Sequence, residues 1–229
     1  VQDGVFTDVG ALMGSSQSQG YAISESGHVA AGWHGTSGPF GVQNALIHTS
    51  WGGPQDGTAF LAQFGVTPPV GATVFNQFVD MDATGNNFVA LIGSPPLFDY
   101  YHVSLPNNWV DLGGASSGTN GLPILEGFGW LNPGMTAGIG LENALPGTVA
   151  ALAYGGSYNP TPVYGGFLGP FPWDGLLFYP TGADGSVEVN FTWPLTMPSG
   201  IQLFLQFGVL DAAGTSGIAL SNTLQATGN

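Results

Sequence analysis

Glycine and proline interrupt this chain so often that it cannot form long helices. The sequence contains 39 glycines and 17 prolines among 229 residues. Both residue types destabilise helix interiors, and no run of about ten residues combines helical apolar spacing with freedom from both. The glycines follow no three-residue period, which excludes collagen. Because 43% of the residues are hydrophobic, the chain can bury a core, and the glycines and prolines indicate turns between many short strands.

Alternation of apolar and other residues predicts where several of these strands lie. The clearest segments are 186–193 and 201–209, and a shorter one is 135–141. In 186–193, the residues expected on one face are Val187, Val189, Phe191 and Trp193. In 201–209, the residues expected on one face are Ile201, Leu203, Leu205, Phe207 and Val209. Side chains of a strand alternate between its two faces, so 186–193 is expected to be a half-buried strand, and the other two segments are expected to be strands as well. Together with the turn residues at 183–185 and 198–200, this pattern predicts an all-β fold containing a sandwich.

The charge composition excludes several classes of partner. The sequence contains no lysine or arginine and 14 aspartates and glutamates, so its formal net charge is −14. Binding to nucleic acid through phosphates needs cationic side chains, and the same holds for anionic membranes and phosphorylated substrates. Salt bridges from lysine or arginine are also impossible. Stability must therefore come from burial and hydrogen bonds, with bound cations as a further source that the charge leaves open.

Cysteine is absent as well, which removes disulfides, thiolate metal sites and thiol catalysis. The longest stretch without a charged residue, 143–173, is broken by glycine and proline and is a poor candidate for a membrane-spanning helix. The sequence starts at Val1 rather than at methionine, and we expect that a secretion signal has been removed. These features predict a secreted, extracellular or cell-surface protein.

The composition changes at 113–121, where small and polar residues replace core-forming ones. We predict a linker at 114–121, between a β-rich domain at 1–113 and a β-sandwich domain at 122–229. The first domain contains a weak internal repeat, because 22–30 and 81–90 both read as a strand end, an acidic turn closed by glycine, and another strand. Two copies are too few to close a propeller.

The second half resembles a domain that recurs at the C-termini of large secreted proteins from planctomycete-type bacteria. The residues that carry this resemblance lie at 145–147, 167–170, 184–185, 193–206 and 210–227. It implies a small immunoglobulin-like β-sandwich without catalytic residues. The first half is similar to HAF-type extracellular repeats at 8–10, 22–27 and 44–47, but it lacks their His-Ala-Phe triplet.

Few residues are arranged for site chemistry. Asp80 and Asp82 begin a candidate calcium loop, but its twelfth position is Leu91 instead of glutamate, and an acidic hairpin turn is the alternative. The string at 114–118 matches a nucleophile elbow without the helix that an elbow requires. The four histidines lack a compact ligand spacing, and we expect them to be isolated. No cofactor other than calcium is indicated.

Aromatic residues cluster in the glycine- and proline-rich loops of the second half. The cluster consists of Tyr154, Tyr158, Tyr164, Trp173 and Tyr179. It is interpreted as a subunit interface or a sugar-stacking platform, with core packing as the alternative. We therefore expect a non-enzymatic structural subunit that self-associates into a filament, appendage or surface layer. The alternatives are an adhesive module that binds surface glycans and a secreted hydrolase.

Overall fold

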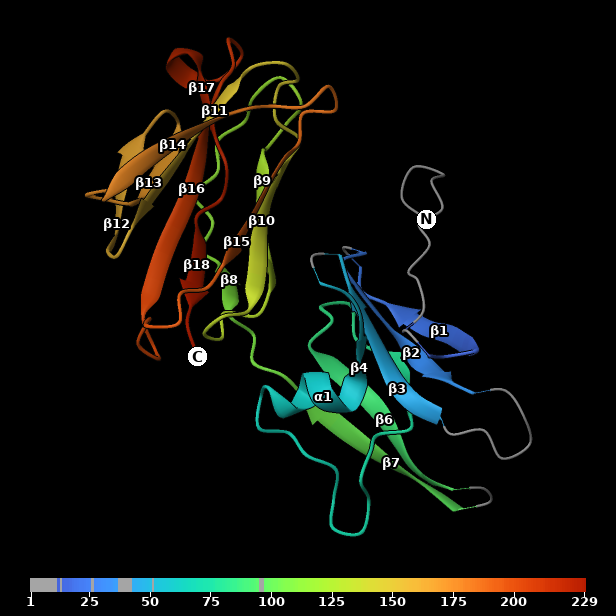
Figure 1. Ribbon diagram of the computed structural model, residues 1–229. Coiled ribbons are helices and arrows are strands. Elements are labelled where there is room, and N and C mark those ends of the chain that lie inside the picture. Colours follow the sequence, from blue (N-terminus) through green and yellow to red (C-terminus); the bar gives the residue numbers. More distant parts are fainter. Residues whose placement is uncertain (1–11, 13, 26, 37–42, 51, 95–96) are drawn as a thin grey trace. The chain divides into compact units, whose positions relative to one another are not determined.

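The computed structural model describes residues 12, 14–25, 27–36, 43–50, 52–94 and 97–229. These residues form antiparallel sheets with one short helix (Figure 1), which confirms the predicted all-β class. The chain divides into two compact units, one ending at Pro106 and the other beginning at Asn107. No helix among the described residues is long and apolar enough to span a membrane.

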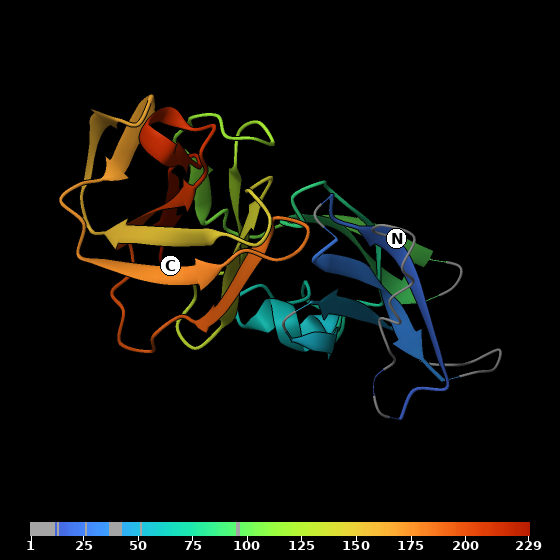
Figure 2. The same ribbon diagram turned by 90° about the horizontal axis from the view of Figure 1, so that it is seen from above.

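The first unit contains two sheets and a helix. One sheet has the order β1-β2-β3-β4, formed by Gln17–Ile23, Val29–Gly35, Gln43–Thr49 and Gly53–Asp56. The other has the order β5-β6-β7, formed by Gln77–Met81, Asn87–Ser94 and Leu97–Ser104. Helix α1, Gly57–Ala62, follows β4 directly. Strand β5 packs against the first sheet (Figure 2), and Phe60, Phe78 and Phe88 are buried in this unit.

The two copies of the predicted repeat form the same hairpin turn. In the first copy, between β1 and β2, the Ser24 amide bonds to the Val29 carbonyl at 2.8 Å, and Gly27 has φ 74°. In the second copy, between β5 and β6, the Asp82 amide bonds to the Asn87 carbonyl at 3.0 Å, and Gly85 has φ 75°. A positive φ explains why both turns end in glycine. The similar residues at 8–10 lie outside the described part of the chain.

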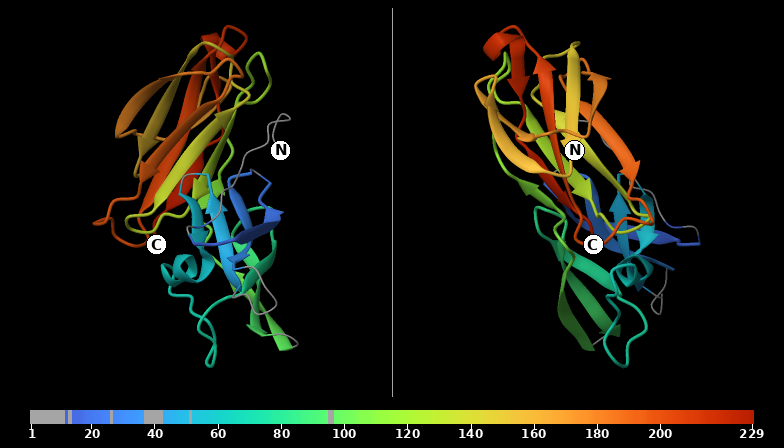
Figure 3. Two further views of the ribbon diagram at one scale, coloured as in Figure 1. Left: turned by 45° about the vertical axis from the view of Figure 1, so that its right-hand side comes forward. Right: turned by 90° about the vertical axis from the view of Figure 1, so that its left-hand side faces the viewer.

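The second unit is a sandwich of two sheets (Figures 1 and 3). The smaller sheet has the order β15-β10-β9, formed by Val187–Thr192, Thr136–Glu142 and Ile124–Gly129. The larger has the order β14-β11-β16-β18-β8, formed by Gly175–Pro180, Val149–Gly155, Gln202–Leu210, Leu224–Thr227 and Trp109–Asp111. Strand β17, Ile218–Leu220, also pairs with β16 and follows a single 3-10 turn at Thr215–Gly217.

The core of the second unit lies between these two sheets. Leu125, Ile139 and Val187 come from the smaller sheet, and Leu152 and Phe207 come from the larger. The alternation at 186–193 and 201–209 therefore predicted β15 and β16 correctly, although Ile201 precedes β16 and is exposed. A sandwich is present, whereas its immunoglobulin-like character remains a prediction.

A third layer covers the other face of β16. Strands β12, Tyr158–Val163, and β13, Gly166–Pro170, form a hairpin on the side of β16 away from β10 (Figure 1). The Gln206 side chain, fully buried on that face, accepts from the Gly169 amide at 2.9 Å and donates to the carbonyls of Phe167 and Ser221 at 2.8 and 2.7 Å. Both faces of β16 are therefore buried, because this hairpin covers Phe204 and Gln206.

The predicted linker at 114–121 belongs to the second unit, and so do the last residues of the predicted first domain. Strand β8 pairs with β18, and the Ser116 amide and hydroxyl bond to the Leu220 carbonyl and amide at 2.9 and 3.0 Å. Thr119 donates from its amide and its hydroxyl to the Asp211 carboxylate, at 2.6 Å each. These contacts place β8 and the predicted linker in the second unit, so the boundary between the units lies at Pro106. The small residues of the predicted linker permit close packing and do not form a flexible connection.

Candidate functional site

Strand edges are the places where this fold can pair with another chain, because an edge strand leaves backbone donors and acceptors unpaired. Proteins protect such edges with charges, prolines, bulges or short strands. In the described part of the chain, six edge strands each contain one carboxylate. They are β4 with Asp56, β5 with Asp80, β7 with Asp99, β8 with Asp111, β9 with Glu126 and β15 with Glu188.

In the described part of the chain, the edge strands without a carboxylate are protected in other ways, except β14. Strand β13 ends in Pro170, and its backbone groups at Phe167 and Gly169 bond to Gln206 and Gly114. A bulge after Gly20 interrupts β1, and β12 contains Pro160 and Pro162 as well as a bulge. Strand β17 is only three residues long and mostly buried. Strand β14 has no charge, and its ladder with β11 runs without a bulge from Gly175 to Pro180. Its only edge protection is the proline at its last position.

Strand β14 exposes large apolar side chains on both of its faces. Leu176, Leu177 and Phe178 are 42%, 45% and 68% exposed. The neighbouring Tyr179 ring packs at 6.1 Å, edge to face, against the buried Phe207 ring, so Tyr179 and Leu177 share the core-facing side of the strand. Leu176 and Phe178 consequently lie on the opposite face. We name Leu176, Leu177 and Phe178 the apolar edge.

The backbone of β14 leaves two residues with outward hydrogen-bonding groups. The Thr181 amide bonds to the Thr148 carbonyl at 2.9 Å, and Thr181 and Thr148 continue the register of β14 and β11. In an antiparallel pair, hydrogen-bonded and non-hydrogen-bonded positions alternate. Tyr179 and Leu177 therefore direct their amides and carbonyls to β11, whereas Phe178 and Leu176 direct theirs away from it.

The surroundings of the apolar edge are almost uncharged. Between Glu142 and Asp184, the only carboxylate is Asp174. One of its oxygens accepts from the Gly156 amide at 2.9 Å. Just before it, the Phe171 and Trp173 rings lie 5.8 Å apart, edge to face, and Trp173 is 44% exposed. Like-charge repulsion is therefore weaker here than at edges that carry a carboxylate.

The predicted aromatic cluster separates into two groups. Tyr154 and Tyr179 are half-buried and pack against the core of the sandwich. Tyr158, Tyr164 and Trp173 are exposed in the outer hairpin and the loop after it, and the Tyr158 ring lies 5.4 Å from the Phe204 ring. Only this second group is available to a partner.

Sequence reasoning missed the residues of the apolar edge. Their signal was visible as an uncharged apolar run at 175–180, directly after Trp173 and Asp174. That run does not reveal that its strand stands at the border of a sheet, because the border depends on which strands pair.

Asp82 anchors a turn. One of its oxygens accepts from the Asn86 and Asn87 amides at 3.1 Å each, and the other accepts from the Asn87 side chain at 2.7 Å. The Thr84 hydroxyl lies within 2.9 Å of both. Partial burial raises the pKa of the Asp82 carboxyl, but the bonds from Asn87, Thr84 and Asn86 outweigh it and leave the pKa below its usual value. These donors occupy the lone pairs that a cation would need.

Among the described residues, Asp80 accepts a hydrogen bond only from the Met81 amide, at 2.9 Å. The described residues contain no group of three or more histidine, cysteine, aspartate or glutamate side chains that could hold a metal ion. This geometry favours the acidic-turn alternative, and a calcium site at Asp80 and Asp82 remains an untested prediction.

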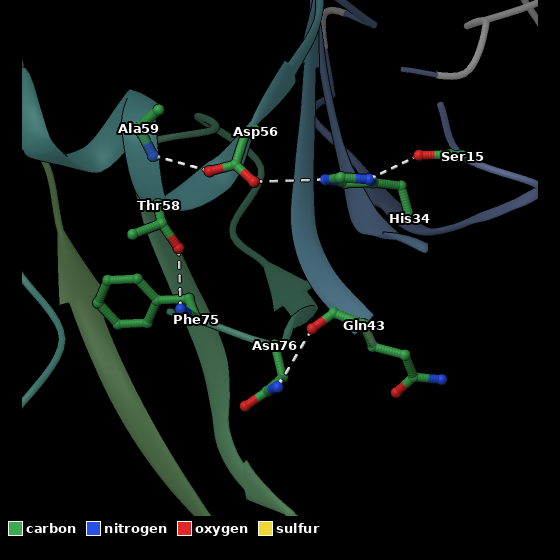
Figure 4. A network of polar contacts seen from close by, with 8 residues as sticks. All are labelled: Ser15, His34, Gln43, Asp56, Thr58, Ala59, Phe75 and Asn76. Carbon is green, nitrogen blue, oxygen red and sulfur yellow. Dashed lines mark hydrogen bonds and ion pairs between the residues drawn. The ribbon is translucent and has the colours of Figure 1, made fainter. Parts of the chain in front are cut away.

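A polar network in the first unit joins three segments (Figure 4). The Ser15 hydroxyl lies 2.8 Å from Nδ1 of His34, and Nε2 of His34 lies 3.4 Å from Oδ2 of Asp56. Oδ1 of Asp56 accepts from the Ala59 amide at 2.9 Å and so caps helix α1. His34 is thus bonded to two partners, neither of which is another histidine.

The combination of serine, histidine and aspartate is also the one that activates a nucleophilic hydroxyl. Such chemistry needs backbone amides that stabilise an oxyanion near the hydroxyl. The amides of Ser15 and Ser16 are already bonded to the carbonyls of Leu12 and Gly35, at 3.1 and 2.9 Å. We therefore assign this network a structural role, in which it holds the turn before β1, strand β2 and the start of α1 together.

No known protein family, curated protein or solved structure matches the chain. The resemblance to secreted planctomycete-type domains and HAF-type repeats therefore remains an expectation.

Proposed function

We propose that this chain is an extracellular structural subunit that assembles non-covalently through the apolar edge of its second unit. The observation that supports the proposal is the contrast between β14 and the other edge strands. An uncharged edge with exposed apolar side chains on both faces favours pairing with another strand.

The charge distribution supports the same surface. A subunit with a formal charge of −14 repels its copies, and the repulsion is smallest where carboxylates are fewest. Strand β14 lies in a segment with one carboxylate between Glu142 and Asp184. Association through β14 therefore buries apolar area in a segment that carries few carboxylates.

A second candidate function is adhesion to surface glycans. It is favoured by the exposed Trp173, since an accessible aromatic face can stack on a sugar ring. Trp173→Ala distinguishes the two functions: it should abolish signals on a glycan array if adhesion is the function, and it should leave self-association largely intact if β14 drives assembly.

The test compares one charge placed on the apolar edge with the same charge placed elsewhere. Phe178→Glu should weaken self-association at least about tenfold, because it desolvates a carboxylate in the interface. Leu195→Glu is the matched control, since Leu195 is 78% exposed in a loop of the same unit. Light scattering with size-exclusion chromatography measures the association, and negative-stain microscopy shows whether it forms filaments.

Acid should strengthen the association of the unmodified chain. As the pH falls towards the sequence pI of about 4.1, carboxylates become protonated and the repulsion between copies decreases. Strictly monomeric protein between pH 4 and pH 8 at high concentration would overturn the proposal, and so would equal losses in the Phe178 and Leu195 variants.

A further inference from the structure

The outward groups of β14 restrict how another strand can pair with it. Leu176 and Phe178 each present one amide and one carbonyl away from β11. The flanking positions are poorer partners, because Pro180 has no N–H and the Asp174 amide is already bonded to the Tyr154 carbonyl at 2.8 Å. A partner strand must therefore satisfy two donors and two acceptors over three residues.

A second copy of β14, related by a two-fold axis perpendicular to the sheet, runs antiparallel and can satisfy these groups. Hydrogen bonds between the copies form only where a residue with outward backbone groups lies opposite another such residue. This condition leaves an axis centred on residue 176, 177 or 178. If the axis is centred on residue 176, the Phe178 carbonyl of one copy lies opposite the Asp174 amide of the other copy, which is already bonded. Centring on 178 sets the Leu176 carbonyl against Pro180, which has no N–H. If the axis is centred on residue 177, Leu176 of each copy lies opposite Phe178 of the other copy. This arrangement uses all four outward groups of each strand.

We propose that β14 pairs antiparallel with β14 of a second copy, about a two-fold axis at Leu177. This inference rests on the proposed assembly function and supplies its partner and register. Leu177 then faces Leu177 of the second copy at a non-hydrogen-bonded position, where side chains lie close together. Leu176 packs beside Phe178 of the second copy on the other face. The result is one sheet continuous through two molecules.

The register also keeps the two Asp174 carboxylates apart. Asp174 lies beside Pro180 of the second copy, so the two Asp174 carboxylates stand about six residues apart along the strands. At about 3.3 Å per residue this is roughly 20 Å, well beyond the Debye length of about 8 Å at physiological ionic strength. Centring the axis on residue 176 would bring them about two residues closer.

Because the natural chain contains no cysteine, single cysteines report the register directly. Leu177→Cys should form a disulfide-linked dimer under mild oxidation, since the two Cα atoms would lie within bridging distance. Leu176→Cys and Phe178→Cys should not, because each is displaced by about two residues from its own copy and exceeds about 7 Å. Leu195→Cys is the off-site control.

A proline variant tests the pairing without a cross-link. Leu176→Pro removes an outward donor and leaves the ladder with β11 intact, a substitution that edge strands tolerate. It should abolish the association while preserving the far-ultraviolet circular dichroism and the thermal transition of the second unit. Leu177→Pro is the contrasting variant, because it removes an inward bond and should destabilise the fold itself.

The possible outcomes separate this inference from the proposed function. Cross-linking at 177 alone, with loss of association in Leu176→Pro, supports the two-fold pairing. Cross-linking at 176 or 178, or at none of the three positions while Phe178→Glu still abolishes association, overturns the register and leaves the assembly function standing. A chain that stays monomeric in every variant overturns both.

Discussion

Trp109 should stabilise the second unit, although it precedes the composition break in the sequence. Its indole N–H donates to the Gly129 carbonyl at 2.9 Å, and its ring lies 6.5 Å from the Phe191 ring, edge to face. The ring also lies directly against the backbone of Gly127. Through Trp109, strand β8 is thus attached to the sandwich of the second unit.

Trp109→Ala removes these contacts together. Truncating a large aromatic side chain in a core costs about 3–5 kcal/mol, and we expect about 3 kcal/mol because Trp109 is only half-buried. For a unit of this size, that loss lowers the melting temperature by about 10 °C. Val110→Ala is the matched control on the same strand, since Val110 is exposed and its truncation should change stability by less than about 0.5 kcal/mol.

Differential scanning calorimetry of the full chain measures the effect, and the isolated fragment 107–229 identifies which transition belongs to the second unit. Fragment 107–229 should fold, whereas fragment 122–229, which lacks β8 and the residues bonded to β17 and Asp211, should be markedly less stable. If Trp109→Ala instead lowered the transition that fragment 107–229 lacks, β8 would belong to the first unit. The boundary at Pro106 would then be wrong.

Two further predictions concern polar groups. Gln206→Leu leaves the Gly169 amide and the carbonyls of Phe167 and Ser221 without their partner, so it should cost about 3 kcal/mol and expose the β12–β13 hairpin to proteolysis; a hairpin that remains resistant would contradict this. The pKa of Asp82 is lowered in the fold by its hydrogen bonds, so its contribution is present above the unfolded value of about 3.9 and is lost as the pH falls through the folded value. Denaturation of the first unit between pH 2 and pH 6 should show this loss in the natural chain and less of it in Asp82→Asn.

Local periodicity predicted strands well where one face meets the core. Val187, Val189 and Phe191 alternate with exposed residues in β15, as expected. The same pattern predicted β16, but it does not indicate that Phe204 and Gln206 on the other face of this strand are buried too. Alternation identifies two faces of a strand, but only the tertiary arrangement decides whether a second layer covers the outer one.

The glycine- and serine-rich segment at 113–121 illustrates the opposite error. Small residues suggested a flexible connection, yet a Cβ at Gly118 would collide with the Asp211 carboxylate. Composition cannot distinguish a segment that is small because it is mobile from one that is small because it packs closely. The apolar edge was missed for a related reason, since the position of β14 at a border is a property of the pairing between strands.

The absence of lysine and arginine gives the aspartates a consistent structural role. Among the described residues, seven aspartates accept a hydrogen bond from a backbone amide, namely Asp56, Asp80, Asp82, Asp111, Asp174, Asp184 and Asp211. A carboxylate without a cationic partner is stabilised by such donors, and turns and strand ends supply amides that the ladders leave unpaired. Carboxylates thus anchor turns and also protect most of the sheet edges. Strand β14 lacks a carboxylate and a bulge, and it exposes Leu176, Leu177 and Phe178. Among the described edge strands, it therefore departs most from how this chain protects its sheet edges.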